Sequence, residues 1–285
     1  MSISDGGKGS RLRDNSERNP PDWTSLLLWG FPVAVILFIV LPIASVFLTL
    51  PGSNVALEAV NSDTLNAVRL SLITSTTSLC VMVLVGIPTA LVLTRNRSKG
   101  TKLIDTILDI PIVLPPAVAG LALLLAFAPR SPIGAILLQY GIILPGNIVA
   151  VIMAQTFVAM PFFLRSARTA FEEINPRIEM AANLLSPSRF YSFRRVVLPL
   201  ASRGLVAGAI LGWGRAMGEF GATLLFAGNL PGYTQTMPLA IYLDLGGQGI
   251  QQASFVAGIL ITISFAVIAG VRYATGSRGL FGTRS

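Results

Sequence analysis

Arg215 and Glu219 are oppositely charged residues that lie deep in a long apolar stretch, where they could form an ion pair or contact an anion. They stand four residues apart in the stretch GWGRAMGEFGA, so on a helix they share one face and can form an ion pair. In a membrane segment this pair must face protein or water, because an unpaired charge there costs roughly 2.5–3.5 kcal/mol. Either the pair locks packed helices together, or Arg215 attracts an anion while Glu219 holds it in place. The neighbouring Gly214 and Gly218 have the GxxxG spacing that predicts close helix packing.

Residue types that commonly carry catalysis are scarce. The chain has no histidine and a single cysteine, Cys80, which excludes His-dependent catalysis, an intramolecular disulfide and a cluster of thiolates around a metal. It also has no G-x-x-x-x-G-K-[ST] phosphate loop. We therefore expect a protein that is not an enzyme, binds no metal and no cofactor, and relies on another polypeptide for any use of ATP.

The segment GNLPGYTQTMP offers neutral hydrogen-bonding groups outside the apolar stretches. Asn229, Thr234, Gln235 and Thr236 could stabilise an anion without binding it too tightly for release. They would line the outer gate of a pathway. The alternative is an ordinary external turn, because the same residue types dominate turns.

Asp105 and Asp109 also stand four residues apart, just before the proline-rich IPIVLPPAVAG. A carboxylate would repel an anionic substrate, so we interpret the two as structural partners of basic residues in the adjacent loop. Pro111, Pro115 and Pro116 predict a break or kink in this helix.

The segment 171–200 is too charged to span a membrane and too apolar for a free linker. Its first half, 176–185, begins with proline and has apolar residues at helical spacing. Ser186 and Pro187 then predict the N-cap and first turn of a second helix. Together they predict a compact knob, or alternatively an amphipathic helix on the lipid surface. The apolar face of the second helix would consist of Phe190, Phe193, Val196 and Val197.

Composition places these residues in a membrane protein. Of 285 residues, 53% are apolar and 12% charged, against about 25% charged in ordinary soluble domains. The net charge of +8 does not form the stripe of a nucleic-acid-binding surface. Six apolar stretches are long enough to cross a bilayer as helices. They are Trp23–Leu50, Asn66–Thr94, Leu103–Ala128, Gly146–Arg168, Leu200–Ala227 and Ala253–Tyr273.

Basic residues set the predicted orientation. Most of the 21 Lys and Arg lie in the two termini, the loop after the second stretch and the segment 171–200, so these regions are predicted to be cytoplasmic. The membrane domain covers 23–275, between a disordered tail at 1–22 and a second tail at 276–285. Two shorter apolar pieces, Ser131–Pro145 and Met237–Leu245, are either external or re-entrant helices or connectors packed on the bundle.

The segment 171–200 resembles the "EAA" loop of bacterial ABC import permeases. That pattern is EAA, three residues, Gly, nine residues and Ile-x-Leu-Pro. It is matched in spacing by Met180-Ala181-Ala182, Ser186 and Val196-Val197-Leu198-Pro199. Met180, Ser186 and Val196 depart from the pattern, and Glu179 stands one position before the expected acid. The stretches Ile107–Gly120 and Gly214–Tyr242 look like the molybdate branch of these permeases, and the related sulfate permeases share the RAxGE core.

The resemblance implies an all-α permease of the type I ABC importer kind, with six transmembrane helices, in the cytoplasmic membrane of a prokaryote. Its partners would be membrane lipid, a second copy of itself, a cytoplasmic ABC ATPase dimer and an external oxyanion-binding protein. Glu179, Met180, Ala181, Ala182, Ser186 and Pro187 would contact the ATPase. Arg215 and Glu219, with the four polar residues of 229–236, would belong to the pathway or its gate.

Three other functions compete with a molybdate or tungstate importer. Sulfate is a similar oxyanion, and a sulfate permease remains an alternative. A channel or ion-coupled carrier would need no ATPase, but buried titratable residues, which would favour it, are few. A membrane-embedded enzyme lacks a suitable constellation of His, Cys or carboxylates.

Overall fold

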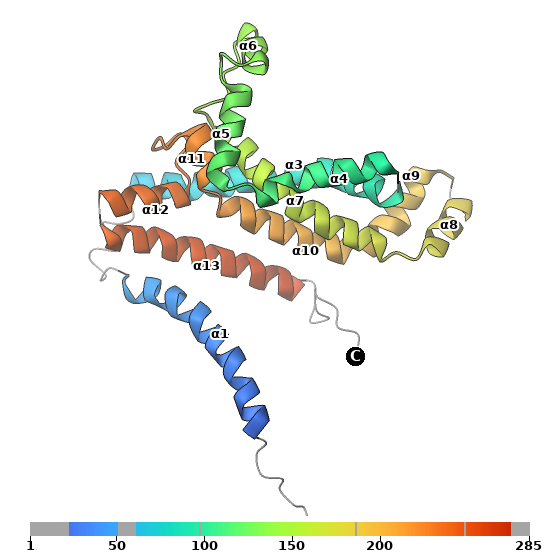
Figure 1. The fold of residues 1–285 in the computed structure, drawn as a ribbon, viewed down its shortest axis with the longest axis horizontal. Coiled ribbons are helices and arrows are strands. Elements are labelled where there is room, and N and C mark those ends of the chain that lie inside the picture. Colours follow the sequence, from blue (N-terminus) through green and yellow to red (C-terminus); the bar gives the residue numbers. More distant parts are fainter. Residues whose placement is uncertain (1–22, 51–60, 97, 186, 248, 275–285) are drawn as a thin grey trace, which may run out of the picture. The chain divides into compact units, whose positions relative to one another are not determined.

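The computed structural model describes residues 23–50, 61–96, 98–185, 187–247 and 249–274. These residues form helices joined by short connections, with no strand among them (Figure 1). The all-α class predicted from the sequence is confirmed. Both predicted tails, 1–22 and 276–285, lie outside the described residues.

Five helices are long and apolar enough to cross a membrane, or six if the bent pair α4 and α5 is one crossing. α4 (Lys99–Val113) and α5 (Pro116–Phe127) are bent by 116° relative to each other, at the predicted proline break. The other crossings are α1 (Trp23–Leu48), α3 (Ser62–Arg95), α7 (Ile148–Glu172), the run from α9 (Arg189–Ser192) through η1 (Phe193–Val197) to α10 (Leu198–Met217), and α13 (Ile250–Ala274).

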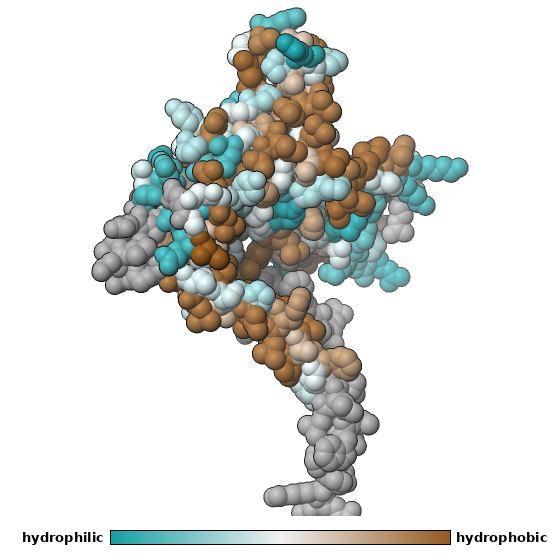
Figure 2. Space-filling view, turned by 60° about the vertical axis from the view of Figure 1, so that its left-hand side comes forward, coloured by the Kyte–Doolittle hydropathy of each residue, from teal (hydrophilic) through white to brown (hydrophobic). Residues whose placement is uncertain are grey.

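Helix α1 is a unit of its own, and the remaining helices form a second unit. From Trp29 to Leu41 the side chains of α1 are exposed, and most of them are apolar. A helix that is apolar on all sides is typical of a membrane span. Apolar side chains also cover large parts of the surface seen in Figure 2.

Four shorter helices complete the chain: α6 (Pro132–Gln139), α8 (Pro176–Leu185), α11 (Gly221–Ala227) and α12 (Met237–Gly246). α6 and α12 occupy the two short apolar pieces predicted from the sequence. α12 packs against α13 and α3, and the backbone N–H of Met237 donates to the Ser71 hydroxyl at 2.7 Å. This packing favours the interpretation of α12 as a connector on the bundle.

The second unit is built around α3, α7 and α10, which pack closely because small residues lie at their contacts. A Cβ atom on Gly208 of α10 would lie 2.8 Å from Cβ of Ser166 on α7. In contrast, a Cβ atom on Gly214 would meet nothing within 4 Å, and one on Gly218 would meet only a backbone oxygen of its own helix, at 3.6 Å. Within this chain the close approach predicted for Gly214 and Gly218 is therefore made earlier on α10, by Gly204 and Gly208.

Gly208→Ala is expected to destabilise the second unit by about 1–3 kcal/mol, because the added methyl group must displace α7. Gly270→Ala on α13 is the matched control, since a Cβ atom there meets nothing within 4 Å. Alanine is the better helix former by about 1 kcal/mol, so the control should be neutral or stabilising. The measurement is the thermal unfolding midpoint of the detergent-solubilised chain. Equal shifts for both variants would contradict the close contact.

Candidate functional site

Helix α8 presents exposed apolar side chains at one end of the second unit. It has the bounds predicted from the sequence, and none of its residues is buried. Leu184 and Leu185 are 85% and 88% exposed, and Met180 is 65% exposed. Ala181 is also exposed, whereas Ala182 is half-buried. Apolar groups gathered on a surface in this way are typical of an interaction site.

The helix after α8 begins later than predicted. Its N-cap is Ser188, whose hydroxyl accepts a hydrogen bond from the backbone N–H of Tyr191 at 3.1 Å. The prediction that Ser186 and Pro187 cap and begin this helix is therefore wrong. Pro187 is exposed and lies before the helix, and Ser186 lies outside the described residues.

The second helix of the predicted knob is not a separate element. α9 continues through a π-helical turn, η1, directly into α10. At the end of this turn the backbone N–H of Leu198 donates to the carbonyl of Phe193, five residues earlier. The next residue, Pro199, has no N–H and cannot continue α-type bonding, which favours such a wide turn. The predicted apolar face is only partly buried: Val197 is 3% exposed and Phe190 is 70% exposed.

An ion pair holds α8 to the end of α3. The Glu179 carboxylate contacts the guanidinium of Arg95, the last residue of α3, and both side chains are partly shielded from solvent. Glu179 therefore helps to hold α8 against α3 of the same chain. The apolar side chains of α8 remain free for another molecule.

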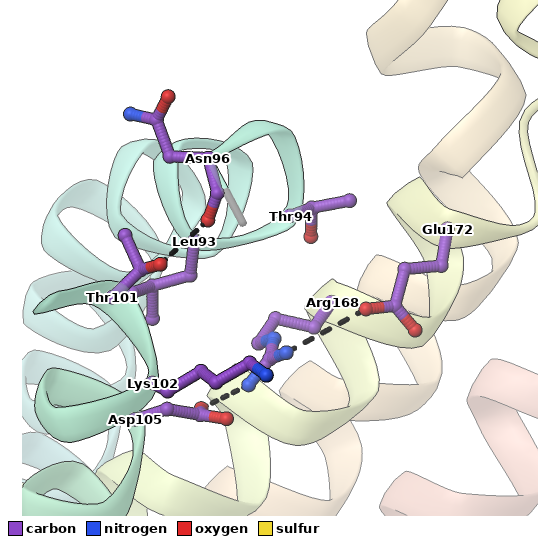
Figure 3. A pocket seen from close by; sticks show the side chains of 8 residues that line it. All are labelled: Leu93, Thr94, Asn96, Thr101, Lys102, Asp105, Arg168 and Glu172. Carbon is purple, nitrogen blue, oxygen red and sulfur yellow. Dashed lines mark hydrogen bonds and ion pairs between the residues drawn. The ribbon is translucent and has the colours of Figure 1, made fainter. Parts of the chain in front are cut away.

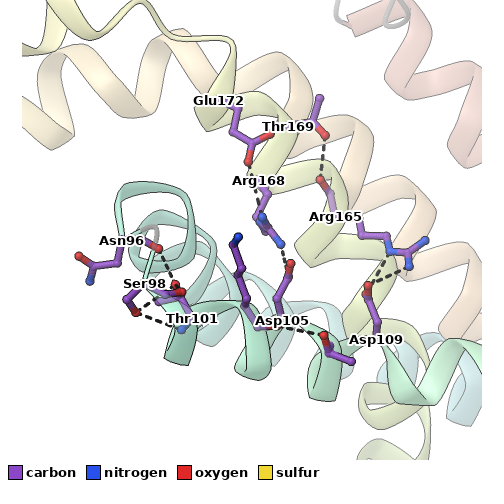
Figure 4. A network of polar contacts seen from close by, with 11 residues as sticks. Asn96, Ser98, Thr101, Asp105, Asp109, Arg165, Arg168, Thr169 and Glu172 are labelled. Carbon is purple, nitrogen blue, oxygen red and sulfur yellow. Dashed lines mark hydrogen bonds and ion pairs between the residues drawn. The ribbon is translucent and has the colours of Figure 1, made fainter.

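Asp105 and Asp109 bind arginines of α7, not the basic residues of the adjacent loop, and that prediction is wrong. Arg165 donates from Nε and Nη2 to the two Asp109 oxygens at 3.0 and 2.9 Å, while Arg168 pairs with Asp105 (Figure 4). The order of the two pairs shows that α4 and α7 run antiparallel. The sequence signal was available but easily missed, because two acids four residues apart face two arginines three residues apart.

Arg215 and Glu219 form the predicted ion pair, with 2.7 Å between Nη1 and Oε2. The Glu219 side chain is 1% exposed and Arg215 is 29% exposed. Glu219 Oε1 also accepts the backbone N–H of Ala222 at 2.8 Å and so caps the start of α11. The predicted single helix Leu200–Ala227 is wrong for this reason: α10 ends at Met217, and the Glu219 carboxylate joins the two helices at the break.

The outer polar segment is a hydrogen-bonded turn in this structure. The Thr234 hydroxyl accepts the N–H of Leu230 at 3.0 Å, and the Asn229 amide donates to the carbonyl of Leu239 at 3.2 Å. Gln235 is 4% exposed and Thr236 is fully buried. The Thr236 hydroxyl and the side-chain amide oxygen (Oδ1) of Asn229 have no hydrogen-bond partner among the described residues. The turn interpretation thus accounts for Thr234. It does not account for the two buried polar atoms of Asn229 and Thr236.

The described residues bring these predicted sites to separate places. α8 lies at the end of the bundle where α3 ends, whereas Arg215 and Glu219 stand at the break between α10 and α11. Sequence reasoning missed Arg95, Arg165 and Arg168 as the partners of the acidic residues. Within the described ranges no group of three or more Cys, Asp or Glu could hold a metal ion.

Three transport permeases are similar to this chain in sequence. The chain is 34% identical to the molybdenum transport system permease protein of Mycobacterium tuberculosis over 93% of this chain and 98% of that protein. It is 33% identical to the molybdate/tungstate transport system permease protein of Pyrococcus furiosus over 90% and 96%. The sulfate transport system permease protein of Salmonella typhimurium is 36% identical over 64% and 66%.

A solved structure shares the fold. One chain of a bacterial alginate ABC transporter, crystallised with a periplasmic protein bound to an alginate pentasaccharide, superposes with a TM-score of 0.71 at 16% identity, over 92% of this chain and 96% of that one. Residues 82–275 match the family described as the binding-protein-dependent transport system inner membrane component. The chain belongs to this family, and it is a multi-pass membrane permease of the ABC importer kind.

Proposed function

We propose that this permease carries a tetrahedral oxyanion, molybdate or tungstate, into the cell. The observation that supports this substrate is the likeness to the molybdenum permease of M. tuberculosis along almost the whole of both chains. The sulfate permease matches a shorter part, which makes sulfate the second candidate. Molybdate and tungstate have nearly the same size and charge, so we assign the choice between them to the external binding protein.

In this proposal the chain hydrolyses no ATP and holds no cofactor. A cytoplasmic ABC ATPase dimer would dock on α8 and supply the energy. The exposed Met180, Leu184 and Leu185 support docking there, and the pair of Glu179 with Arg95 would pass movement of α8 to α3. Ala181, Ala182, Ser186 and Pro187 would complete the contact. In keeping with the positive-inside rule, α8, both termini and the basic loops would lie on the cytoplasmic side of a prokaryotic inner membrane.

The translocation pathway would lie between two copies of the chain, with the external oxyanion-binding protein delivering the anion. Arg215 is a candidate for its wall, because its guanidinium is partly exposed while Glu219 holds it. Asn229, Thr234, Gln235 and Thr236 are candidates for the outer gate. Since Gln235 and Thr236 are buried in the present conformation, the outer segment would have to open.

Transport measurements test this function. Proteoliposomes that contain the chain, its ATPase and its binding protein should take up labelled molybdate only when ATP is present on the ATPase side. Uptake without the ATPase would favour a channel or an ion-coupled carrier. Competition by sulfate at equal concentration should be weak, and strong competition would favour the sulfate candidate.

The outer gate has a separate test. Gln235→Leu with Thr236→Val is expected to lower molybdate uptake, because an anion loses neutral donors on its path. Co-purification of the ATPase should be unchanged, since Gln235 and Thr236 are buried and lie about fifty residues after α8 in the sequence. Wild-type uptake by the double variant would remove the segment from the pathway.

A further inference from the structure

A pocket of about 400 Å³ opens where α3 ends, α4 begins and α7 ends (Figure 3). Its lining includes two cations, Lys102 and Arg168, and two carboxylates, Asp105 and Glu172. None of the transport roles proposed above uses this pocket. It lies at the end of the bundle that carries α8, where the candidate membrane spans α3 and α7 end and α4 begins.

Two buried donors in the pocket lack a hydrogen-bond partner among the described residues. Arg168 contacts Asp105 and, at 3.6 Å, Glu172, yet its Nε is buried without a hydrogen-bond acceptor. The hydroxyl of Thr94 is likewise buried and without a partner among the described residues. Lys102 points into the pocket and forms no ion pair within the described part of the chain. These groups could satisfy the oxygens of a small anionic group.

An apolar strip leads away from the pocket along α4. Lys99, Leu103 and Ile107 follow one another at four-residue intervals, so they lie on one face of the helix, and Ile110 continues that face. Leu103, Ile107 and Ile110 are 63%, 52% and 46% exposed, and α4 buries none of its residues. Side chains on a helix point toward its N-terminus, so Lys99 reaches toward the bilayer surface above the strip.

We propose that the pocket binds the phosphate of an anionic phospholipid, whose acyl chain lies along the strip of α4. A pocket that holds Lys102 and Arg168, has Lys99 at its rim and is continued by apolar side chains fits both parts of a lipid. The four charges that line the pocket cancel, so a free dianion gains little from them. A singly charged headgroup that is anchored by its acyl chain also gains from Lys99 at the rim. The inference does not depend on which oxyanion is transported.

Native mass spectrometry of the full-length chain in detergent tests the proposal. Phosphatidylglycerol and phosphatidylcholine with identical acyl chains are titrated separately. Phosphatidylglycerol should bind more tightly, and Lys99→Ala with Lys102→Ala should weaken it at least about tenfold, since each lysine near a membrane surface contributes to anionic-lipid binding. Binding of phosphatidylcholine should not change. Both lysines are exposed, so the double variant should keep the thermal midpoint of the parent chain.

Arg194→Ala with Arg203→Ala is the matched control. It removes the same charge from exposed positions outside the pocket and should leave lipid binding within about twofold. Equal losses in both double variants would mean general attraction to the basic end of the protein and would overturn the site. Equal affinity of the two lipids would overturn it as well. Displacement of phosphatidylglycerol by millimolar sodium molybdate would show that the pocket binds the free oxyanion instead.

Discussion

Replacing Glu219 by alanine is expected to destabilise the second unit by about 3 kcal/mol, the lower end of the usual effect of breaking a buried ion pair, because the remaining Arg215 is 29% exposed. The carboxylate is 1% exposed, pairs with Arg215 and caps α11 through the N–H of Ala222. Its loss leaves a guanidinium without a counterion and the first turn of α11 without an acceptor. In detergent, the thermal unfolding midpoint should fall by roughly 10 °C.

Asp109→Ala is the matched control for Glu219→Ala. It also removes a carboxylate from an arginine pair, but the side chains of Asp109 and Arg165 are 37% and 60% exposed. An ion pair at such exposure contributes at most about 1 kcal/mol. Glu219→Gln should lie between the two, because glutamine keeps an acceptor for the Ala222 N–H and loses the charge. If Glu219→Ala and Asp109→Ala shift the midpoint equally, Glu219 does not hold the break between α10 and α11.

The second large effect is expected at α8. Leu184→Asp with Leu185→Asp should abolish co-purification of the ATPase and the ATP hydrolysis stimulated by the binding protein. Burying an unpaired carboxylate in a docking groove costs about 1–3 kcal/mol for each residue, and the two together weaken binding by about thirty-fold to about twenty-thousand-fold. The thermal midpoint of the chain alone should not change, because both leucines are at least 85% exposed.

Asn183→Asp is the control for these two substitutions. It adds a carboxylate to the same helix at an exposed position that is already polar, so coupling should survive. Ala182→Asp, which also charges α8, is less selective because Ala182 is half-buried in the chain itself. Retained ATPase binding by the double leucine variant would mean that α8 is not the docking element.

The sequence was most informative where local rules decide the structure. The bounds of α8 were predicted because a proline begins the helix and apolar residues follow at helical spacing. The bend between α4 and α5 was predicted because three prolines interrupt that stretch. The pair of Arg215 and Glu219 was predicted because residues four apart on a helix are neighbours.

Interactions between helices escaped prediction. The partners of Asp105 and Asp109 lie about sixty residues away on α7, and only the packed fold brings them together. The break after Met217 depends on a side-chain oxygen of Glu219 reaching the N–H of Ala222, which no periodicity reveals. Close helix packing was predicted for Gly214 and Gly218 because their spacing fits, but it is Gly204 and Gly208 that lie against side chains of α7.

The π turn η1 sets the angle about the α10 axis at which α8 and α9 lie. Such a turn is an α-helix with one residue inserted, and each residue of an α-helix corresponds to about 100° of rotation. Deleting a single residue within Phe193–Val197 would therefore leave α10 in its place and swing α9 and α8 through roughly 100° around its axis. Glu179 would then face away from Arg95. The direction in which the exposed leucines of α8 point thus depends on the one extra residue in the π turn.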